Sequence, residues 1–150
     1  MDLELTDKRA VITGGSRGIG LGCAMALARE GCHVQLAARN EETLRHAKAA
    51  VLEAAGTVDV LTHSVDLSAS EDQRALVDAA GEVDIWINNA GAIPAGDIST
   101  INERRWRDAW DLKVFGYINL CREVYAAMEA RGTGVIINVI GAAAVRPQPS

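Results

Sequence analysis

The sequence predicts an α/β fold in which helices cover both faces of a parallel sheet. Short runs of β-branched residues alternate along the chain with longer, alanine-rich segments. Such alternation is typical of parallel strands joined by right-handed helical crossovers. The strand runs are apolar without a break, which indicates strands that are buried on both faces. We therefore expect a three-layer, doubly wound sheet, a Rossmann fold, with the strand order 3-2-1-4-5.

The first half of the chain carries two strand–helix pairs. A buried strand is expected at 10–13, followed by a helix over 18–30. Gly31 ends this helix, as a glycine commonly does at a helix C-terminus. A second strand at 33–38 leads to a helix over 41–55, which has acidic residues in its first turn. The apolar residues expected to share one face of the first helix are Ile19, Cys23, Ala26 and Leu27.

The rest of the chain continues the same alternation. Ser68 or Ser70 is expected to cap the third helix, because a serine hydroxyl can accept a hydrogen bond from an unpaired N–H group of the first turn. The last helical segment is long enough for one helix or for two that meet near Asp111. The later elements are predicted, in chain order, at 58–65 (strand), 70–80 (helix), 83–87 (strand), 103–131 (helix) and 134–140 (strand).

The composition is that of a single globular domain over residues 1–150. Hydrophobic residues make up 49% of the chain and charged residues 23%, the balance of a folded soluble protein. The net charge of −5 and the lack of a basic patch argue against nucleic-acid binding. No apolar stretch reaches the ~20 residues of a membrane span. The acidic start, residues 1–5, lacks the basic region of a secretory signal.

The cysteines and histidines do not form a recognisable disulfide or metal pattern. Cys23, Cys32 and Cys121 are widely spaced and contain no C-x-x-C pair, so we expect reduced thiols in a cytoplasmic protein. No metal site is expected, because the histidines lack the spacing of metal ligands. These histidines are His33, His46 and His63.

A glycine-rich turn, T-G-G-S-R-G-I-G over residues 13–20, lies between the first strand and the first helix. Glycines permit a sharp turn and a close approach of the backbone to a ligand. The helix that follows directs unpaired N–H groups and its positive dipole end at the turn, an environment that suits a pyrophosphate. The spacing differs from the G-x-G-x-x-G dinucleotide fingerprint. The residues expected against a cofactor here are Gly14, Ser16, Arg17, Gly18, Ile19 and Gly20.

This T-G-x-x-x-G-x-G turn resembles that of the short-chain dehydrogenase/reductase family. The N-N-A-G sequence at 88–91, after the predicted fourth strand, is similar to the family motif that supports the central sheet and borders the cofactor. The V-D-L sequence at 65–67 resembles the family's D-[LV] pair, whose Asp contacts the adenine ring. The resemblance covers nearly the whole chain. It adds Asp66, Leu67, Asn89, Ala90 and Gly91 to the expected cofactor site.

The end of the second strand indicates which nicotinamide cofactor is bound. Sites selective for NAD place an Asp or Glu there, on the ribose 2′-hydroxyl, and this carboxylate repels the 2′-phosphate of NADP. Here the strand ends in A-A-R-N, without an acid. Arg39 can offer a fork of N–H donors to a phosphate, and Arg17 can approach it from the glycine turn. We therefore expect NADP(H) to be preferred, with NAD(H) as the alternative.

The catalytic pattern of the family is only partly present. Members usually interconvert an alcohol and a carbonyl with an Asn-Ser-Tyr-Lys set, in which the Tyr is the acid/base. By resemblance, Lys113 stands at the Asn position and Gly141 at the Ser position. The Tyr-x-x-x-Lys motif would fall beyond Ser150, and neither Tyr117 nor Tyr125 is followed by a Lys four residues later. We expect Lys113 to point into the cofactor crevice as a positive charge, and Gly141 to have no catalytic role.

Three functions remain open from the sequence. The first is an NADP(H)-dependent oxidoreductase acting on a small alcohol or ketone, of which this chain would be the N-terminal portion. The second is an NADP(H)-binding sensor or scaffold protein of the same fold without hydride chemistry, which the departures at Lys113 and Gly141 favour. The third, a nucleotide-sugar epimerase of the extended relatives, is disfavoured by the N-N-A-G motif and the glycine spacing.

The resemblance also implies a homodimer or a homotetramer built partly on the segment 103–131. Large apolar patches on a helical face usually mark an interface. The aromatic residues expected on such an exposed face are Trp106, Trp110 and Tyr117.

Overall fold

The computed structural model describes residues 3–97 and 99–141. Its strands form one five-stranded sheet in the order β3-β2-β1-β4-β5, and every neighbouring pair is parallel. The predicted fold class and strand order are therefore confirmed. The strands are β1 (Arg9–Thr13), β2 (His33–Ala38), β3 (Val60–Ser64), β4 (Ile85–Asn88) and β5 (Val135–Asn138).

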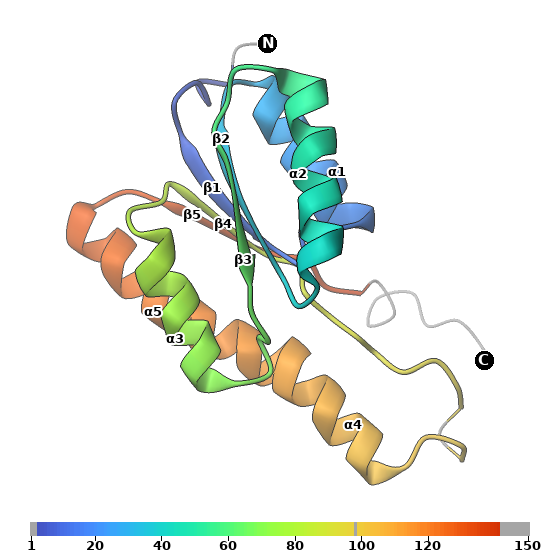
Figure 1. The fold of residues 1–150 in the computed structure, drawn as a ribbon. Coiled ribbons are helices and arrows are strands. Elements are labelled where there is room, and N and C mark those ends of the chain that lie inside the picture. Colours follow the sequence, from blue (N-terminus) through green and yellow to red (C-terminus); the bar gives the residue numbers. More distant parts are fainter. Residues whose placement is uncertain (1–2, 98, 142–150) are drawn as a thin grey trace.

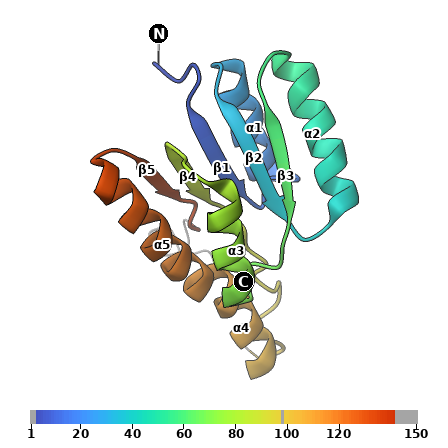
Figure 2. The same cartoon turned by 60° about the vertical axis from the view of Figure 1, so that its left-hand side comes forward.

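Helices cover both faces of the sheet, which gives three layers (Figures 1 and 2). α1 (Gly18–Arg29) and α2 (Glu41–Ala55) pack together on one face. α3 (Ser70–Ala80) and α5 (Gly116–Arg131) pack together on the other. α4 (Glu103–Trp110) continues the line of α5 past the end of the sheet (Figure 1).

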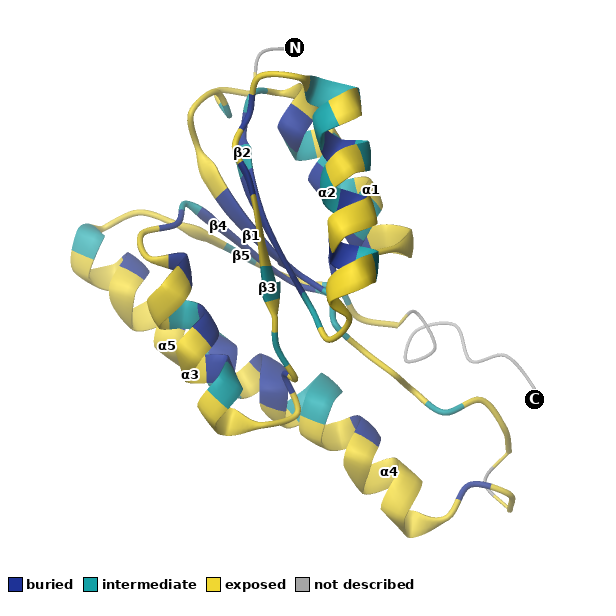
Figure 3. Cartoon of the chain, viewed as in Figure 1, coloured by how far each residue is buried: buried dark blue, intermediate teal, exposed yellow. Residues whose placement is uncertain are grey.

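The side chains of the central strands divide between two cores, because successive residues of a strand point to opposite faces. Ile12 of β1 belongs to the core beneath α1 and α2, whereas its neighbour Val11 belongs to the core beneath α3 and α5. Trp86 of β4 is fully buried in the second core, where its indole N–H donates to Asn88 Oδ1 at 2.8 Å. Figure 3 shows the buried residues concentrated along β1, β2 and β4, as expected for strands covered on both faces.

The face that α1 presents to the sheet differs from the prediction. Its buried residues are Gly20, Ala24 and Ala28, which recur at four-residue spacing and so form one row along the helix. These small side chains let α1 lie close to the strands. The predicted face was wrong at Ala26, which is exposed, and at Ile19, which is 66% exposed.

The long helical segment changes its winding at the predicted place. A π-helical turn, η1 (Asp111–Phe115), separates α4 from α5. Gly116 follows this turn and is buried, and a Cβ on it would lie 3.1 Å from the carbonyl oxygen of Leu67. Extra residues in a helical turn often mark functional sites. Tyr117, which the sequence placed on an exposed face, is instead buried, because the π turn rotates α5 so that Tyr117 faces inward.

Two further expectations are corrected. Neither Ser68 nor Ser70 caps α3: Ala69 is the N-cap residue, and the Ser68 hydroxyl donates to Asp66 Oδ1 at 2.8 Å instead. The helix begins at Ser70, so Ser68 lies before the N-cap position and Ser70 lies after it, and neither hydroxyl stands where it could accept from the first turn. The fifth strand was expected to be buried, but Val135 is 52% exposed, because β5 is an edge strand with β4 as its one neighbour among the described strands.

Replacing Trp86 by alanine is expected to lower the free energy of unfolding by about 3–5 kcal/mol, because the large buried side chain leaves a cavity. Leu61→Ala is the control, since Leu61 is 52% exposed and lies outside the segment proposed as an interface, and its effect should stay within about 0.5 kcal/mol. Urea denaturation followed by circular dichroism measures both values. Equal losses in the two variants would contradict the placement of Trp86 in the core.

Candidate functional site

The glycine-rich turn joins β1 to α1 at the carboxyl end of the sheet. Gly14 and Gly18 have φ angles of 65° and 55°, in the left-handed region where glycine is favoured. The Gly14 amide donates to the carbonyl of Ala37 at 2.7 Å, which ties the turn to the end of β2. Arg17 precedes α1, and no side chain caps this helix. Its first N–H groups therefore remain available to an anion.

Thr13 and Asn89 connect the end of β1 to the segment that follows β4. The buried Thr13 hydroxyl accepts hydrogen bonds from the backbone amides of Asn89 (2.9 Å) and Ala90 (3.0 Å), and it donates to the carbonyl of Ile87 at 3.2 Å. The Asn89 side-chain amide donates back to the carbonyls of Thr13 (3.1 Å) and Gly14 (3.2 Å). The N-N-A-G segment and the glycine turn are thus fixed to each other.

Two glycines make room for this connection. A Cβ on Gly14 would lie 2.9 Å from both Ala90 Cα and Asn89 Nδ2. A Cβ on Gly20 would lie 2.6 Å from Asn89 Nδ2 and would also meet the carbonyl oxygen of Gly14. These separations are below the 3.0 Å that real Cβ atoms keep. The turn can therefore pack against Asn89 only with glycine at both positions.

A crevice of about 480 Å³ opens at the carboxyl ends of the strands, where the strand order reverses between β1 and β4. Ligands of open α/β sheets bind at such a switch point. The crevice is lined by Gly14, Ser16, Arg17, Ile19, Ala37, Ala38, Arg39, Asn40, Thr43, Val65, Asp66, Leu67, Asn89, Ala90, Gly91, Ala92 and Leu112.

The crevice brings together all the residues that the sequence placed at the cofactor except Gly18 and Gly20. Gly20 is buried behind Gly14, and Gly18 begins α1. Several lining residues directly precede or follow a motif, so the rule that ligands bind at strand ends could have identified them. Thr43 and Leu112 come from helices, whose path past the crevice no motif indicates. The lining residues that sequence reasoning did not assign to the site are Ala37, Ala38, Asn40, Thr43, Val65, Ala92 and Leu112.

The charged side chains of the crevice are Arg17, Arg39 and Asp66. Neither of the two residues that directly follow β2 is a carboxylate, and Glu41 and Glu42 of the next turn do not line the crevice. Asn40 is the second of these two residues and caps α2, accepting from the Thr43 amide at 2.8 Å. The carbonyl of Arg39 accepts from the Ser64 hydroxyl at 3.2 Å, which ties the Arg39 backbone to the end of β3. The end of β2 therefore presents a cation, on a fixed backbone, to the crevice.

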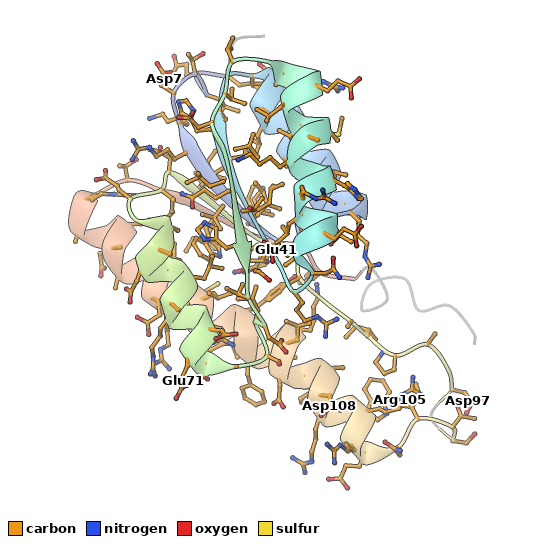
Figure 4. All side chains as sticks on the ribbon, in the orientation of Figure 1. Asp7, Glu41, Glu71, Asp97, Arg105 and Asp108 are labelled. Atoms are coloured by element: carbon orange, nitrogen blue, oxygen red, sulfur yellow. The ribbon has the colours of Figure 1, made fainter. Side chains whose placement is uncertain are left out.

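A second hollow, of about 570 Å³, adjoins the crevice on the side of α4. Arg39 and Asp66 line both spaces, so the two form one continuous groove. Arg105 and Asp108 of α4 line the outer part, and Figure 4 shows both on that helix beside the loop that carries Asp97. The outer part of the groove therefore carries both signs of charge, beside apolar residues such as Ile93 and Leu112.

Lys113 lies in the π turn, next to the crevice. Its Nζ donates to the carbonyl of Val139 at 2.6 Å and to the Tyr117 hydroxyl at 2.7 Å. Its Cδ lies 3.0 Å from the position that a Cβ on Gly91 would take, so the Lys113 stem runs directly behind this lining residue. Burial lowers the pKa of Lys113 and raises the pKa of Tyr117 to about 12.

Gly141 follows β5 and is exposed, and a Cβ on it would meet no atom of the described residues within 4 Å. It brings no hydroxyl to the site. The described residues contain no group of three or more His, Cys, Asp or Glu side chains that could hold a metal ion. In this same part of the chain, no helix has the length and apolar character needed to cross a membrane. The cysteines Cys23, Cys32 and Cys121 are free.

The sequence matches the short chain dehydrogenase family over residues 8–150, and the chain belongs to this family. It is 35% identical over 143 residues to gluconate 5-dehydrogenase of Gluconobacter oxydans, covering 91% of this chain and 54% of that protein. Its structure is similar to that of L-sorbose reductase from Gluconobacter frateurii in complex with NADPH and L-sorbose. The TM-score is 0.91, with 38% identity over 99% of this chain and 57% of the reductase.

A structure of NAD⁺-bound xylitol dehydrogenase is also similar, with a TM-score of 0.87 and 26% identity over 97% of this chain and 57% of that protein. The chain thus spans between 54% and 57% of the length of these relatives. NADPH and NAD⁺ each occur among the similar structures. Family membership therefore does not determine which of the two cofactors is bound, and the residues of the crevice have to be considered.

Gly20→Ala is expected to lower the free energy of unfolding by about 1–3 kcal/mol, because its Cβ has no space against Gly14 and Asn89. Gly22→Ala is the matched control on the same helix. A Cβ on Gly22 meets nothing within 4 Å, so this change should raise the free energy of unfolding by about 0.5–1 kcal/mol. Urea titrations measure both variants. If Gly20→Ala also stabilised the protein, the close packing of the turn would be disproved.

Proposed function

We propose that this chain is the cofactor-binding portion of an NADP(H)-dependent oxidoreductase that interconverts a small alcohol and a ketone. The observation that supports this most directly is the crevice at the switch point. There the uncapped N-terminus of α1 lies beside the glycine turn, and Arg17 and Arg39 line the same space. Members of the family to which the chain belongs include reductases and dehydrogenases of this substrate class.

The crevice residues suit a dinucleotide. The absence of a side chain at Gly14 lets the backbone approach a pyrophosphate, and the free N–H groups of α1 suit its negative charge. Asp66 and Leu67 border the side proposed for adenine, and Gly91 borders the opposite side, proposed for nicotinamide. When bound, the nicotinamide supplies or accepts the hydride. The residues of this chain would hold the dinucleotide and set its orientation.

The proposed preference for NADP(H) over NAD(H) is supported by the charges at the end of β2. A carboxylate that could bind the ribose 2′-hydroxyl is replaced there by Arg39 and Asn40. All three residues Asn40, Arg39 and Arg17 line the crevice, but the side-chain oxygen of Asn40 is engaged in capping α2. Two guanidinium groups in one space suit a 2′-phosphate, since each can donate two parallel N–H bonds to it.

Lys113 is proposed to supply the positive charge that a lysine provides at the catalytic site of other members. Its ammonium lies beside Gly91 at the end of the crevice proposed for nicotinamide. A cation within ~4–6 Å stabilises a phenolate or alkoxide and lowers the pKa of its conjugate acid. The proposed tyrosine partner lies beyond Ser150.

The second candidate function is an NADP(H)-binding sensor or scaffold protein without hydride chemistry. It is favoured by one observation: Gly141 presents no hydroxyl at the position where the family has its serine. Both candidates require the same cofactor site, but they differ in turnover. A protein that binds NADP(H) in the crevice and reduces no carbonyl compound would support this second function.

We also propose that residues 1–150 form one nucleotide-binding domain, that the protein is cytoplasmic, and that it is a homodimer or homotetramer. The free cysteines are consistent with a reducing compartment. On α4 and the π turn, Trp106, Trp110 and Phe115 are between 36% and 52% exposed, which suits an interface.

Sedimentation velocity at micromolar concentration should show a dimer or tetramer, and a monomer would contradict the proposed assembly.

Arg39→Ala is expected to weaken NADP⁺ binding by about 10- to 100-fold, the effect of losing a charge-assisted contact of about 1.5–3 kcal/mol. NAD⁺ affinity should change little, because NAD⁺ lacks the 2′-phosphate. Arg45→Ala is the matched control, since Arg45 is an exposed arginine of the neighbouring helix α2. Calorimetric titration of both cofactors measures these affinities. Equal affinity of the unmodified protein for NADP⁺ and NAD⁺ would refute the proposed preference.

In the full-length protein, Lys113→Met is expected to lower kcat by roughly 10²–10⁴-fold, the usual effect of removing an acid/base element. It should also move the pH optimum upward, because a phenol that loses a neighbouring cation ionises at higher pH. Lys48→Met, on the outer helix α2, is the control and should leave turnover unchanged. Wild-type turnover of Lys113→Met at every pH would exclude this role and would favour the sensor function.

A further inference from the structure

Lys113 and Tyr117 form a hydrogen-bonded pair one helical turn apart, at the edge of the crevice. Lys113 Nζ donates to the Tyr117 hydroxyl at 2.7 Å and lies 4.5 Å from the centre of the Tyr117 ring. The Tyr117 hydroxyl in turn donates to the carbonyl of Val139 at 3.3 Å, and Nζ donates to the same carbonyl at 2.6 Å. The order Lys-x-x-x-Tyr is the reverse of the Tyr-x-x-x-Lys order that is typical of the family.

The pair is held by rigid surroundings. Tyr117 is 8% exposed, so its ring cannot easily turn away. The amide of Val139 donates to the carbonyl of Asn88 at 2.8 Å, which continues the ladder between β4 and β5 and fixes the Val139 carbonyl. An ammonium has three N–H donors. Two of them have acceptors here, and among the described residues no acceptor is recorded for the third.

Lys113 does not itself line the crevice, but its side chain packs against Gly91, which does. Nζ lies 3.4 Å from the position that a Cβ on Gly91 would occupy, and Gly91 lines the crevice. Because Gly91 has no side chain, the ammonium lies close to the backbone that borders the crevice. The hydroxyl groups of a ribose are suitable acceptors for a charged N–H donor.

We infer that Tyr117 is a positioning residue, which holds the Lys113 ammonium beside Gly91 so that its third N–H binds a hydroxyl oxygen at the nicotinamide end of the dinucleotide. This inference rests on the proposed function, which places that end of the cofactor at Gly91. Tyr117 itself touches no ligand. Its role is to fix the direction and the protonation of Lys113.

The surroundings of Nζ determine which member of the pair titrates. Burial raises the pKa of Tyr117 to about 12 and lowers the pKa of Lys113, so the phenol keeps its proton while the lysine loses its own as the pH rises. Gly91 and Val139, from the other segments packed against Nζ, bring no titratable side chain. Among the described residues, no carboxylate forms a salt bridge with Lys113 within 4.0 Å.

The pairing is tested by measuring the pKa of Lys113 directly, from the Cε chemical shift of ¹³C-labelled lysine against pH. Tyr117→Phe keeps the ring but removes the acceptor oxygen, which stabilises the charged ammonium. The pKa of Lys113 should therefore fall by about one pH unit. Tyr125→Phe is the control, because the Tyr125 hydroxyl bonds to Glu129 on the exposed side of α5. An unchanged pKa in Tyr117→Phe, with the fold intact by circular dichroism, would overturn the pairing.

The ligand contact is tested by titrating the same labelled protein with two ligands. NADP⁺ should move the Lys113 resonance and leave those of Lys8 and Lys48 in place, whereas adenosine 2′,5′-bisphosphate, which lacks the nicotinamide ribose, should move none of them. If both ligands bind and move Lys113 equally, the contact with the nicotinamide end is wrong. If neither ligand binds, the proposed function and this contact fail together, while the pKa measurement still decides the role of Tyr117.

Discussion

The contact between Thr13 and Asn89 holds the carboxyl ends of β1 and β4 in a fixed relation, and the rest of the site depends on it. The buried Thr13 hydroxyl accepts hydrogen bonds from two backbone amides of the N-N-A-G segment. The Asn89 side-chain amide in turn donates two hydrogen bonds to carbonyls of Thr13 and Gly14. Unsatisfied polar groups at this depth would be costly. Because all of these groups are paired, the turn, the first residues of α1 and Gly91 keep one arrangement around the crevice.

The small residues of α1, rather than its large ones, determine how closely this helix packs against the sheet. The row of Gly20, Ala24 and Ala28 brings the helix close to the sheet, so that its uncapped N-terminus points at the crevice. On the opposite side, the π turn brings Leu112 to the crevice and Lys113 behind Gly91. The catalytic and cofactor-binding sides of the proposed site therefore meet at a backbone segment that Thr13 and Asn89 hold in place.

The fold class, the strand order and most of the crevice could be predicted from the sequence, because glycine spacing, strand ends and motif positions are local signals. What could not be predicted depends on packing between distant segments. The burial of Tyr117 and its contact with Lys113 follow from a π turn, which no residue in D-L-K-V-F signals on its own. The exposure of β5 depends on its position at the sheet edge, and α3 has no serine cap because it begins at Ser70, which leaves Ala69 at the N-cap position.

A crystal structure of the protein with NADP⁺ would show whether the Thr13–Asn89 contact shapes a dinucleotide site. We expect the pyrophosphate against the glycine turn and the N-terminus of α1, the 2′-phosphate between Arg17 and Arg39, and the nicotinamide ribose beside Gly91 and Lys113. A pyrophosphate bound elsewhere, or a 2′-phosphate directed into solvent away from both arginines, would contradict this expectation.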